Sequence, residues 1–351
     1  MKKAISITMV KDEEKIIESF VRYNNYYFDQ MVIIDNGCTD KTMDIVWKLK
    51  EEGYPLLVYN ESYVDYEQAM IENKYLQKVA KEQDVDWIVP LDADEFFYAD
   101  SKNIWDELME NNIYYVYWKT YVLQDNDDLN EVCIPKRMQS VIKIKEGKEE
   151  NSVTKVIVPA KRVESGELYI SAGHHTVMGK KNEEMICYLD NVFLAHFPII
   201  SKEQMFIKIN GSYNNFIPWM TRGTSASHVN QHKIKFEEGE YDIDLLAKGG
   251  WVVGIENLEN YDIIYDPLNP EVVNTIQMKY TDSVPIDVTD YFIRQAEIFG
   301  IKLFNAKKGI GKKNIPKVLI YGTGSGAEHI FDNMEEECVE VLAYIDSNKT
   351  N

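Results

Sequence analysis

Apolar and polar residues alternate along the first hundred positions in a pattern that predicts strands and helices in turn. Short apolar runs, typical of buried strands, occupy residues 4–10, 31–34, 56–59 and 87–91. Apolar residues at helical spacing occupy 13–27, the segment that begins at Thr39-Asp40, and 66–82. Strands that alternate with helices indicate βαβ units, so we predict an α/β fold with a parallel sheet.

The pattern changes after residue 113. We predict a helix at 201–213 and strands at 114–118, 140–144, 153–158, 168–170 and 192–197. The next hundred residues are weakly periodic, with one predicted helix near 289–299. A new strand–turn–helix–strand unit follows Pro316, with its helix at 328–334. We therefore divide the chain into a main domain (1–215), a mixed or helical extension (216–312) and a small βαβ unit (313–351), which we expect to be the start of a truncated domain.

Charge and composition exclude several classes of protein. The net charge of −20 leaves no basic field for a nucleic acid, so we expect no such partner. No apolar run is long enough to span a membrane, and the apolar start lacks a signal-peptide cleavage site. The four cysteines form no CxxC pair, which favours free thiols in a reducing compartment. We expect a cytoplasmic protein, either free or peripheral at the inner face of the membrane.

Three polar clusters follow predicted strands: Lys11 to Glu13, Asp35 to Asp40, and Asp92 to Glu95. The carboxyl ends of parallel strands meet at one edge of a sheet, where such folds bind ligands. Two carboxylates separated by one small residue, Asp92-Ala93-Asp94, can hold Mg²⁺ or Mn²⁺ and leave positions open for phosphate oxygens. The same triplet could be a solvated acidic turn, but its place at a strand end favours the metal.

These motifs, in this order, resemble those of glycosyltransferase family 2. The resemblance covers roughly residues 4–215, and it rests on Lys11-Asp12-Glu13, on 35–42 (DNGCTDKT), on Asn73-Lys74, on 87–96 (WIVPLDADEF), on Lys155, on Gly173-His174-His175, and on His196-Phe197-Pro198 with Ser201, Gln204, Lys208 and Gly211. It implies a GT-A fold, which is a mixed, mainly parallel sheet flanked by helices. Asp12, Cys38 and Ile200 depart from the family's usual Asn, Ser and Arg, and the last departure puts one phosphate contact in doubt.

The resemblance also implies roles for individual residues. Asp35 would accept a hydrogen bond from the base, which favours uracil, although Asp-Asn-Gly is also a strong turn signal. Lys74 would lie near the nucleotide, or it could simply be a solvated helix residue. The other implied contacts are Thr8, Val10 and Glu13 to base and ribose, Asp92 to ribose or metal, Asp94 to the metal, and His175, with His196 second, as an added metal ligand.

Inverting transfer requires a general base that takes the proton of the acceptor hydroxyl. Family spacing points to Asp190, which could equally be a hairpin-turn residue, and Glu95 is the second candidate. We thus predict a Mn²⁺- or Mg²⁺-dependent hexosyltransferase of bacterial polysaccharide biosynthesis, which uses a nucleotide-sugar donor, UDP-linked by preference, and a glycan or lipid-linked acceptor. Donor sugar, acceptor and oligomeric state cannot be read from the sequence.

Three alternatives stay open. A nucleotidyltransferase also uses paired carboxylates, but it carries a glycine- and basic-rich loop after the first strand, which residues 10–14 lack. A non-catalytic nucleotide- or glycan-binding module could keep the fold. An NAD-linked oxidoreductase rests only on Gly322, Gly324 and Ala327, which match G-x-G-x-x-[GA], with Asp346 after the next strand.

Overall fold

The computed structural model describes residues 1–61, 68–148, 153–179, 186–215, 234–236, 238–295, 317–321 and 340–345. The chain forms two compact units, Met1–Pro285 and Ile286–Asn351. The C-terminal glycine turn and the predicted helix at 328–334 lie outside the described residues. Within those residues, no helix is both long and apolar enough to cross a membrane.

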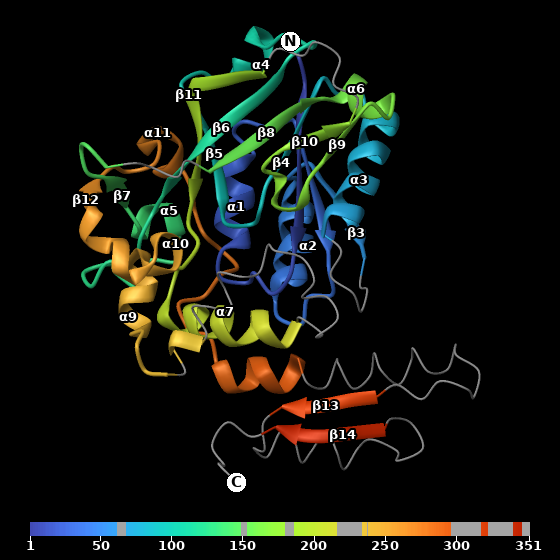
Figure 1. Ribbon diagram of the computed structural model, residues 1–351. Coiled ribbons are helices and arrows are strands. Elements are labelled where there is room, and N and C mark those ends of the chain that lie inside the picture. Colours follow the sequence, from blue (N-terminus) through green and yellow to red (C-terminus); the bar gives the residue numbers. More distant parts are fainter. Residues whose placement is uncertain are drawn as a thin grey trace. The chain divides into compact units, whose positions relative to one another are not determined.

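An eight-stranded sheet forms the framework of the first unit (Figure 1). Its strands are, in spatial order, β3 (Leu56–Asn60), β2 (Gln30–Asp35), β1 (Ala4–Val10), β4 (Trp87–Pro90), β8 (Thr154–Pro159), β6 (Ile113–Thr120), β11 (Ile186–His196) and β5 (Glu95–Ala99). Four of the seven neighbouring pairs are parallel, namely β3–β2, β2–β1, β1–β4 and β6–β11, and the other three are antiparallel. The prediction of a mixed, mainly parallel sheet flanked by helices is confirmed.

Helices cover both faces of the parallel half. Helices α1 (Ile17–Asn24) and α2 (Thr42–Glu52) share one apolar core with Met31 and Ile33 of β2. Helix α3 (Gln68–Glu82) shares a second core with Val32 and Ile34 of the same strand. Successive side chains of a strand point to opposite faces, so this strand needs an unbroken apolar run to serve both cores.

The first unit also contains one longer helix, α7, and several short elements. They comprise α4 (Ile104–Glu107), α5 (Ile134–Arg137), α6 (Ala160–Glu164), α7 (Lys202–Asn215), α9 (Ile243–Leu245), α10 (Trp251–Val253) and α11 (Pro270–Val273), with two antiparallel ribbons, β9 (Leu168–Ile170) with β10 (Val177–Gly179) and β7 (Ser140–Ile144) with β12 (Tyr261–Tyr265). The ribbon of β7 and β12 joins the predicted main domain to the predicted extension, and the first unit runs on to Pro285. The division at residue 215 stays a prediction.

The second unit contains two described strands, β13 (Lys317–Tyr321) and β14 (Glu340–Ile345), which pair in parallel. A parallel pair cannot be joined by a tight hairpin and needs a crossover connection. The two strands therefore agree with the predicted strand–helix–strand pattern.

Residues 278–282, called the strap below, tie the end of the first unit to its beginning. The backbone N–H groups of Lys279, Tyr280 and Thr281 donate to the carboxylate of Glu18 at 2.7, 2.9 and 2.7 Å. Glu18 is fully buried in α1 and also accepts from Arg22 Nε at 2.9 Å. These hydrogen bonds satisfy a buried charge that would otherwise be costly.

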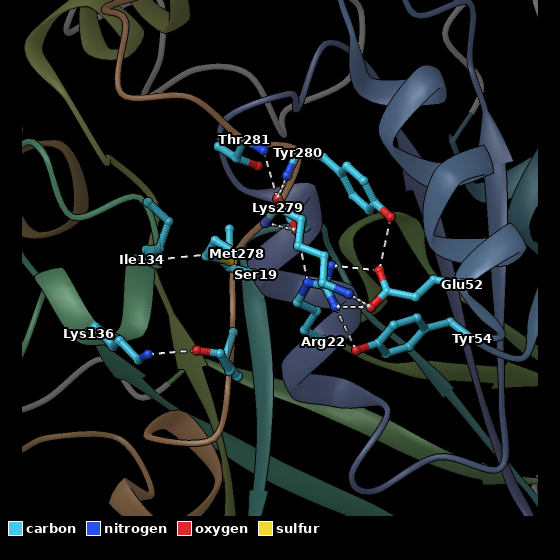
Figure 2. Close-up of polar contacts among 12 residues, drawn as sticks. Ser19, Arg22, Glu52, Tyr54, Ile134, Lys136, Met278, Lys279, Tyr280 and Thr281 are labelled. Carbon is cyan, nitrogen blue, oxygen red and sulfur yellow. Dashed lines mark hydrogen bonds and ion pairs between the residues drawn. The ribbon is translucent and has the colours of Figure 1, made fainter.

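A second layer of contacts holds the strap against α2. Figure 2 shows Glu52 between the Arg22 guanidinium and the side chains of Lys279 and Tyr280. At the far end of the strap, Asp282 lies 2.6 Å from Lys15 and 3.1 Å from Lys41. The strap is thus fastened to the two loops that follow β1 and β2.

Candidate functional site

The polar clusters after β1 and β2 meet, as the sequence predicts. Asp12 Oδ1 accepts from the backbone N–H of Thr39 at 2.6 Å, and the Thr42 hydroxyl accepts from the backbone N–H of Glu13 at 2.6 Å. Lys11 Nζ donates to the carbonyl of Gly37. The two loops therefore form one hydrogen-bonded layer at the carboxyl edge of the sheet.

A cavity of about 290 Å³ opens beside this layer. Its lining brings the first cluster together with the third, and consists of Met9, Val10, Lys11, Glu13, Asp92, Ala93, Asp94 and His196. Burial raises the pKa of Glu13 to about 8, with Asp94, Asp40 and Asp12 adding to the rise against Lys208. A concentration of carboxylates in a cavity is where a cation is most strongly attracted.

Asp94 and His196 form the centre of the cavity. Asp94 Oδ2 lies 3.9 Å from His196 Nε2 and 3.3 Å from Lys208 Nζ of α7. The imidazole stacks on Trp118 with ring centroids 4.1 Å apart, and its Nδ1 is buried without a hydrogen-bond partner among the described residues. Burial lowers the pKa of His196 to about 4, so the ring is neutral at pH 7, which is the form that binds metals.

Asp94 and His196 supply donor types that a divalent ion accepts, a carboxylate oxygen and a neutral imidazole nitrogen. With bonds of about 2.1 Å, two adjacent ligand atoms of an octahedral ion are about 3.0 Å apart and two opposite ones about 4.2 Å. The observed separation of 3.9 Å lies between these values, so the two side chains would have to move closer together to bind at adjacent positions. The donor set therefore fits a divalent cation.

Behind the cavity, Lys155 of β8 lies between two carboxylates. Its Nζ is 2.7 Å from Asp92 Oδ2 and 3.0 Å from Glu95 Oε1, and its side chain is 1% exposed. Glu95 is fully buried and also accepts from Trp118 Nε1 at 2.8 Å. Burial raises the pKa of Glu95 although Lys155 opposes the rise. Burial also opposes the charge of Asp92, but Lys155, His174 and His196 together hold the pKa of Asp92 below its usual range.

A second metal-compatible group lies on the other side of Asp92. Glu72 of α3, Asp92 and His174 place ligand atoms within 4.8 Å of one another. His174 Nε2 is 2.5 Å from Glu72 Oε2, and its Nδ1 is 3.9 Å from Asp92 Oδ1. Burial opposes a charge on His174, but Glu72 and Asp92 raise its pKa, so the two carboxylates favour the protonated imidazole, whereas metal binding requires the neutral ring.

Two of the predicted nucleotide contacts, Asp35 and Lys74, are already paired with other residues. Asp35 Oδ1 accepts from the backbone N–H groups of Gly37 and Cys38 at 2.9 and 2.8 Å, the turn that Asp-Asn-Gly also predicts. Asp35 is at the end of β2, level with Val10. Lys74 pairs with Glu61, and Thr8 is fully buried within β1. Their roles in nucleotide binding stay predictions.

Other predicted residues are not brought to the cavity. His175 contacts the carbonyl of Thr154 through Nδ1 at 3.0 Å, and its ring packs edge-on to Trp118. Asp190 lines a different cavity, from the middle of β11, six residues before His196. Glu95 does not line the cavity and is paired with buried Lys155. The catalytic roles of Asp190 and Glu95, and the metal role of His175, stay predictions.

Sequence reasoning overlooked two residues and undervalued a third. Glu72, which orients His174, and Trp118, which contacts Glu95 and His196, carried no motif. His196 was ranked behind His175 although it lies beside Asp94. Because β11 pairs with β5 in the register His196 to Glu95, the end of β11 is level with the acidic motif. A register between strands a hundred residues apart cannot be read from local patterns.

Comparison with known proteins gives structural similarities only. No family model and no curated protein matches the chain. Among solved structures, it is similar to S. aureus TarS residues 1–349, with 12% identity, 89% of this chain and 82% of that chain covered, and a TM-score of 0.35. For the same protein in complex with UDP the values are 13%, 73%, 77% and 0.33.

A further similarity is to glucosyl-3-phosphoglycerate synthase from Mycobacterium tuberculosis, solved in complex with Mn²⁺, UDP and glucosyl-3-phosphoglycerate. The identity is 16%, the coverage 37% of this chain and 47% of that chain, and the TM-score 0.22. Similarities this weak say nothing of activity, so the case for a function rests on the cavity and its residues.

Proposed function

We propose that this protein transfers a sugar from a nucleoside diphosphate sugar, with uridine as the nucleoside, to a hydroxyl group of a glycan or lipid-linked acceptor. The observation that carries the proposal is the pair of Asp94 and His196, 3.9 Å apart in a cavity at the carboxyl edge of parallel strands. Ligands of open α/β sheets bind at this edge. The motif resemblance supplies the reaction class.

In this proposal Asp94 and His196 hold Mn²⁺ or Mg²⁺. When bound, the ion supplies positive charge that stabilises the departing diphosphate. Lys208, 3.3 Å from Asp94, supplies a second positive charge at the same side of the cavity. Its position orients the Asp94 carboxylate toward α7.

Asp92 has a different task, which is to accept hydrogen bonds from the ribose. Its side chain is 36% exposed to the cavity, while one oxygen is fixed by Lys155 at 2.7 Å. A carboxylate held in one orientation binds a hydroxyl group without a further loss of side-chain entropy. Lys155 is therefore a positioning residue.

The turn after β1 favours sugar transfer over nucleotidyl transfer. Nucleotidyltransferases present glycine amides and basic side chains to the phosphates at this turn. Here Asp12, with φ 57°, turns its carboxylate toward the N–H of Thr39. Lys11 Nζ lies 3.7 Å from the Asp12 carboxylate and donates to the Gly37 carbonyl, so this turn offers a triphosphate neither glycine amides nor an unpaired basic side chain.

Isothermal calorimetry with Mn²⁺, followed by UDP, tests this assignment directly. We expect Asp94→Asn and His196→Gln each to weaken Mn²⁺ binding at least tenfold, about 1.4 kcal/mol. His175→Gln is the matched control, because that ring lies outside the cavity, and it should bind Mn²⁺ like the wild type. Equal losses in His196→Gln and His175→Gln would contradict the ligand set.

Activity is measured separately, as metal-dependent release of UDP from a panel of UDP-sugars in the presence of acceptor. Turnover that survives chelation, or binding of UDP without any turnover, would contradict the metal-dependent transferase; the second result would indicate a non-catalytic module. Asp190→Asn and Glu95→Gln, assayed for turnover with donor binding intact, test the two predicted bases.

A further inference from the structure

A second and larger cavity, of about 570 Å³, lies where α1, β5, β11 and the chain near α11 come together. We call it the Asp190 groove. Asp190 and Asn191 lie on its wall at a register shift between β11 and β6, which occurs between Tyr188 and Phe193. Such irregularities re-aim side chains away from the regular ladder. Asp190 therefore faces this groove and not the cavity at Asp94.

The groove is separate from the metal-compatible cavity. In the antiparallel pair of β11 and β5, Phe193 is opposite Tyr98, and His196 is opposite Glu95. The two pairs are three residues apart, an odd number, so their side chains point to opposite faces of the sheet. Tyr98 and Phe193 line the groove, whereas His196 lines the other cavity.

The Tyr121 hydroxyl reaches the groove without a hydrogen-bond partner among the described residues. Tyr121 lines the groove and is 1% exposed, and its ring stacks on Phe197 with centroids 4.5 Å apart. Neighbouring Tyr27, in contrast, accepts from Asn269 Nδ2 at 2.7 Å. Because the Tyr121 oxygen is not fully enclosed, a ligand in the groove can reach it and supply the missing hydrogen bond.

The rest of the lining offers acceptors and flat apolar surface. Four carboxylates, Asp100, Asp190, Asp266 and Glu271, face two lysines, Lys102 and Lys119, so the lining carries a net charge of 2 − 4 = −2. Lys119 is already paired with Asp266 at 3.1 Å. A phosphorylated or otherwise anionic ligand would therefore be repelled.

The aromatic side chains form the remaining surface. Tyr98 and Phe193 stack with centroids 4.5 Å apart, and Tyr26 is 39% exposed at the same groove. Lys119 Nζ lies over the Phe193 ring at 4.1 Å and Lys102 Nζ over the Tyr26 ring at 5.0 Å, so a ligand that packs on either ring must displace a lysine side chain. A neutral saccharide matches this lining, since its hydroxyl groups donate to carboxylates and its C–H faces pack on aromatic rings. The groove combines a tyrosine hydroxyl, carboxylate acceptors and aromatic rings. This combination suits a sugar better than a simple cation.

We propose that the Asp190 groove binds a neutral saccharide, with Asp190 and the Tyr121 hydroxyl as its hydrogen-bonding partners. That this saccharide is a distal part of the acceptor glycan rests on the proposed function; the binding itself does not. Occupation of the groove would keep a polymeric acceptor on the protein while its end reacts elsewhere.

The test is saturation-transfer NMR on the full chain with maltotetraose, cellotetraose and chitotetraose. At least one should bind at millimolar concentration, and Tyr121→Phe and Asp190→Asn should each weaken that binding about tenfold. Tyr169→Phe and Asp44→Asn, which alter exposed residues outside the groove, are the matched controls. Calorimetry with Mn²⁺ and UDP on the same variants checks their fold and the other cavity.

Failure of all three sugars to bind, or equal binding by the groove and control variants, would overturn the proposal. A competition experiment gives a third result that would overturn the proposal. If tetralysine displaces the bound sugar but a fourth, unrelated neutral tetrasaccharide does not, the groove is a site for a cationic peptide. Loss of sugar binding with intact Mn²⁺ and UDP binding supports the proposal. Sugar binding in a protein without any transferase activity would leave the groove standing and reject the proposed function instead.

Discussion

Lys155 is the residue whose removal should reveal the most about how the carboxylates are held. Lys155→Met keeps the length and apolar stem of the side chain but deletes its charge. Asp92 and Glu95 then lose a cation at 2.7 and 3.0 Å, and Glu95 is fully buried. We expect the fold to persist, because the stem still packs in β8, but at a clear loss of stability.

The magnitude follows from the burial of the ion pairs. Removing one partner of a buried pair costs about 3–5 kcal/mol, because the other charge stays uncompensated. Glu95→Gln in the same background removes that charge, so the double variant should recover about 2 kcal/mol. The two substitutions should therefore be strongly non-additive, with a coupling free energy of about 2 kcal/mol in a double-mutant cycle.

Urea unfolding followed by tryptophan fluorescence, from pH 8 to pH 5, measures both effects. Without Lys155 the folded-state pKa of Glu95 rises further above its unfolded value, so the destabilisation is full at high pH and declines as the carboxyl takes up a proton. Wild-type Asp92, whose pKa lies below its usual range, keeps its contribution throughout this window. Because the wild-type pKa of Glu95 is already about 7, the free-energy gap between variant and wild type should narrow as the pH falls from 8 to about 7 and then stay level down to pH 5.

Lys81→Met, at an exposed position of α3, is the control for loss of a lysine as such. The reasoning is refuted if Lys155→Met destabilises by less than about 1 kcal/mol, or if Lys155→Met and Glu95→Gln are additive. A difference in unfolding free energy between Lys155→Met and wild type that grows toward pH 5 would also show that Glu95 does not titrate as described.

Other features carry predictions of their own. Glu18→Gln leaves the three strap N–H groups facing an amide and should lower the free energy of unfolding by about 3 kcal/mol, against little change for exposed Glu51→Gln, as measured by urea unfolding. The pKa of Glu52 is held at about 2, first by Arg22 and then by the strap lysine. Its contribution is therefore present above about pH 4.5 and lost toward pH 2, so Glu52→Gln should flatten acid unfolding over that range. Deletion of residues 316–351 should leave turnover per folded molecule unchanged, because every predicted donor contact precedes residue 215; loss of donor binding in a well-folded truncation would contradict this.

The parallel half of the fold could be predicted from the sequence because its signals are local. Strands β1, β2 and β4 are short, mainly apolar runs, and their polar ends meet because parallel strands share an edge. Strand β5 was not predicted, since Glu95–Ala99 follows β4 so closely that it was taken as the end of one motif. The first half of β11 carries the apolar run Ile186 to Leu189, but the strand prediction began only at residue 192, so this half was missed.

The site itself was predictable only in part. Asp92 and Asp94 are adjacent in sequence, so their joint presence in the cavity needs no tertiary information. The choice between His175 and His196 depends on the antiparallel register of β11 with β5. Lys155 could be noted as a motif residue, but its position between Asp92 and Glu95 depends on packing among strands far apart in the chain.

The strap has a consequence for how the chain is made. Glu18 and its first backbone partner on the strap are separated by 261 residues. At ribosomal rates of about 5–20 residues per second, roughly 13–50 s pass before that partner has been synthesised. During that interval α1 carries a carboxylate meant for burial, and the loops after β1 and β2 lack their outer fastening. The cavity can therefore reach its final form only late in synthesis, so the N-terminal half should depend on chaperones or on delayed folding until the strap emerges.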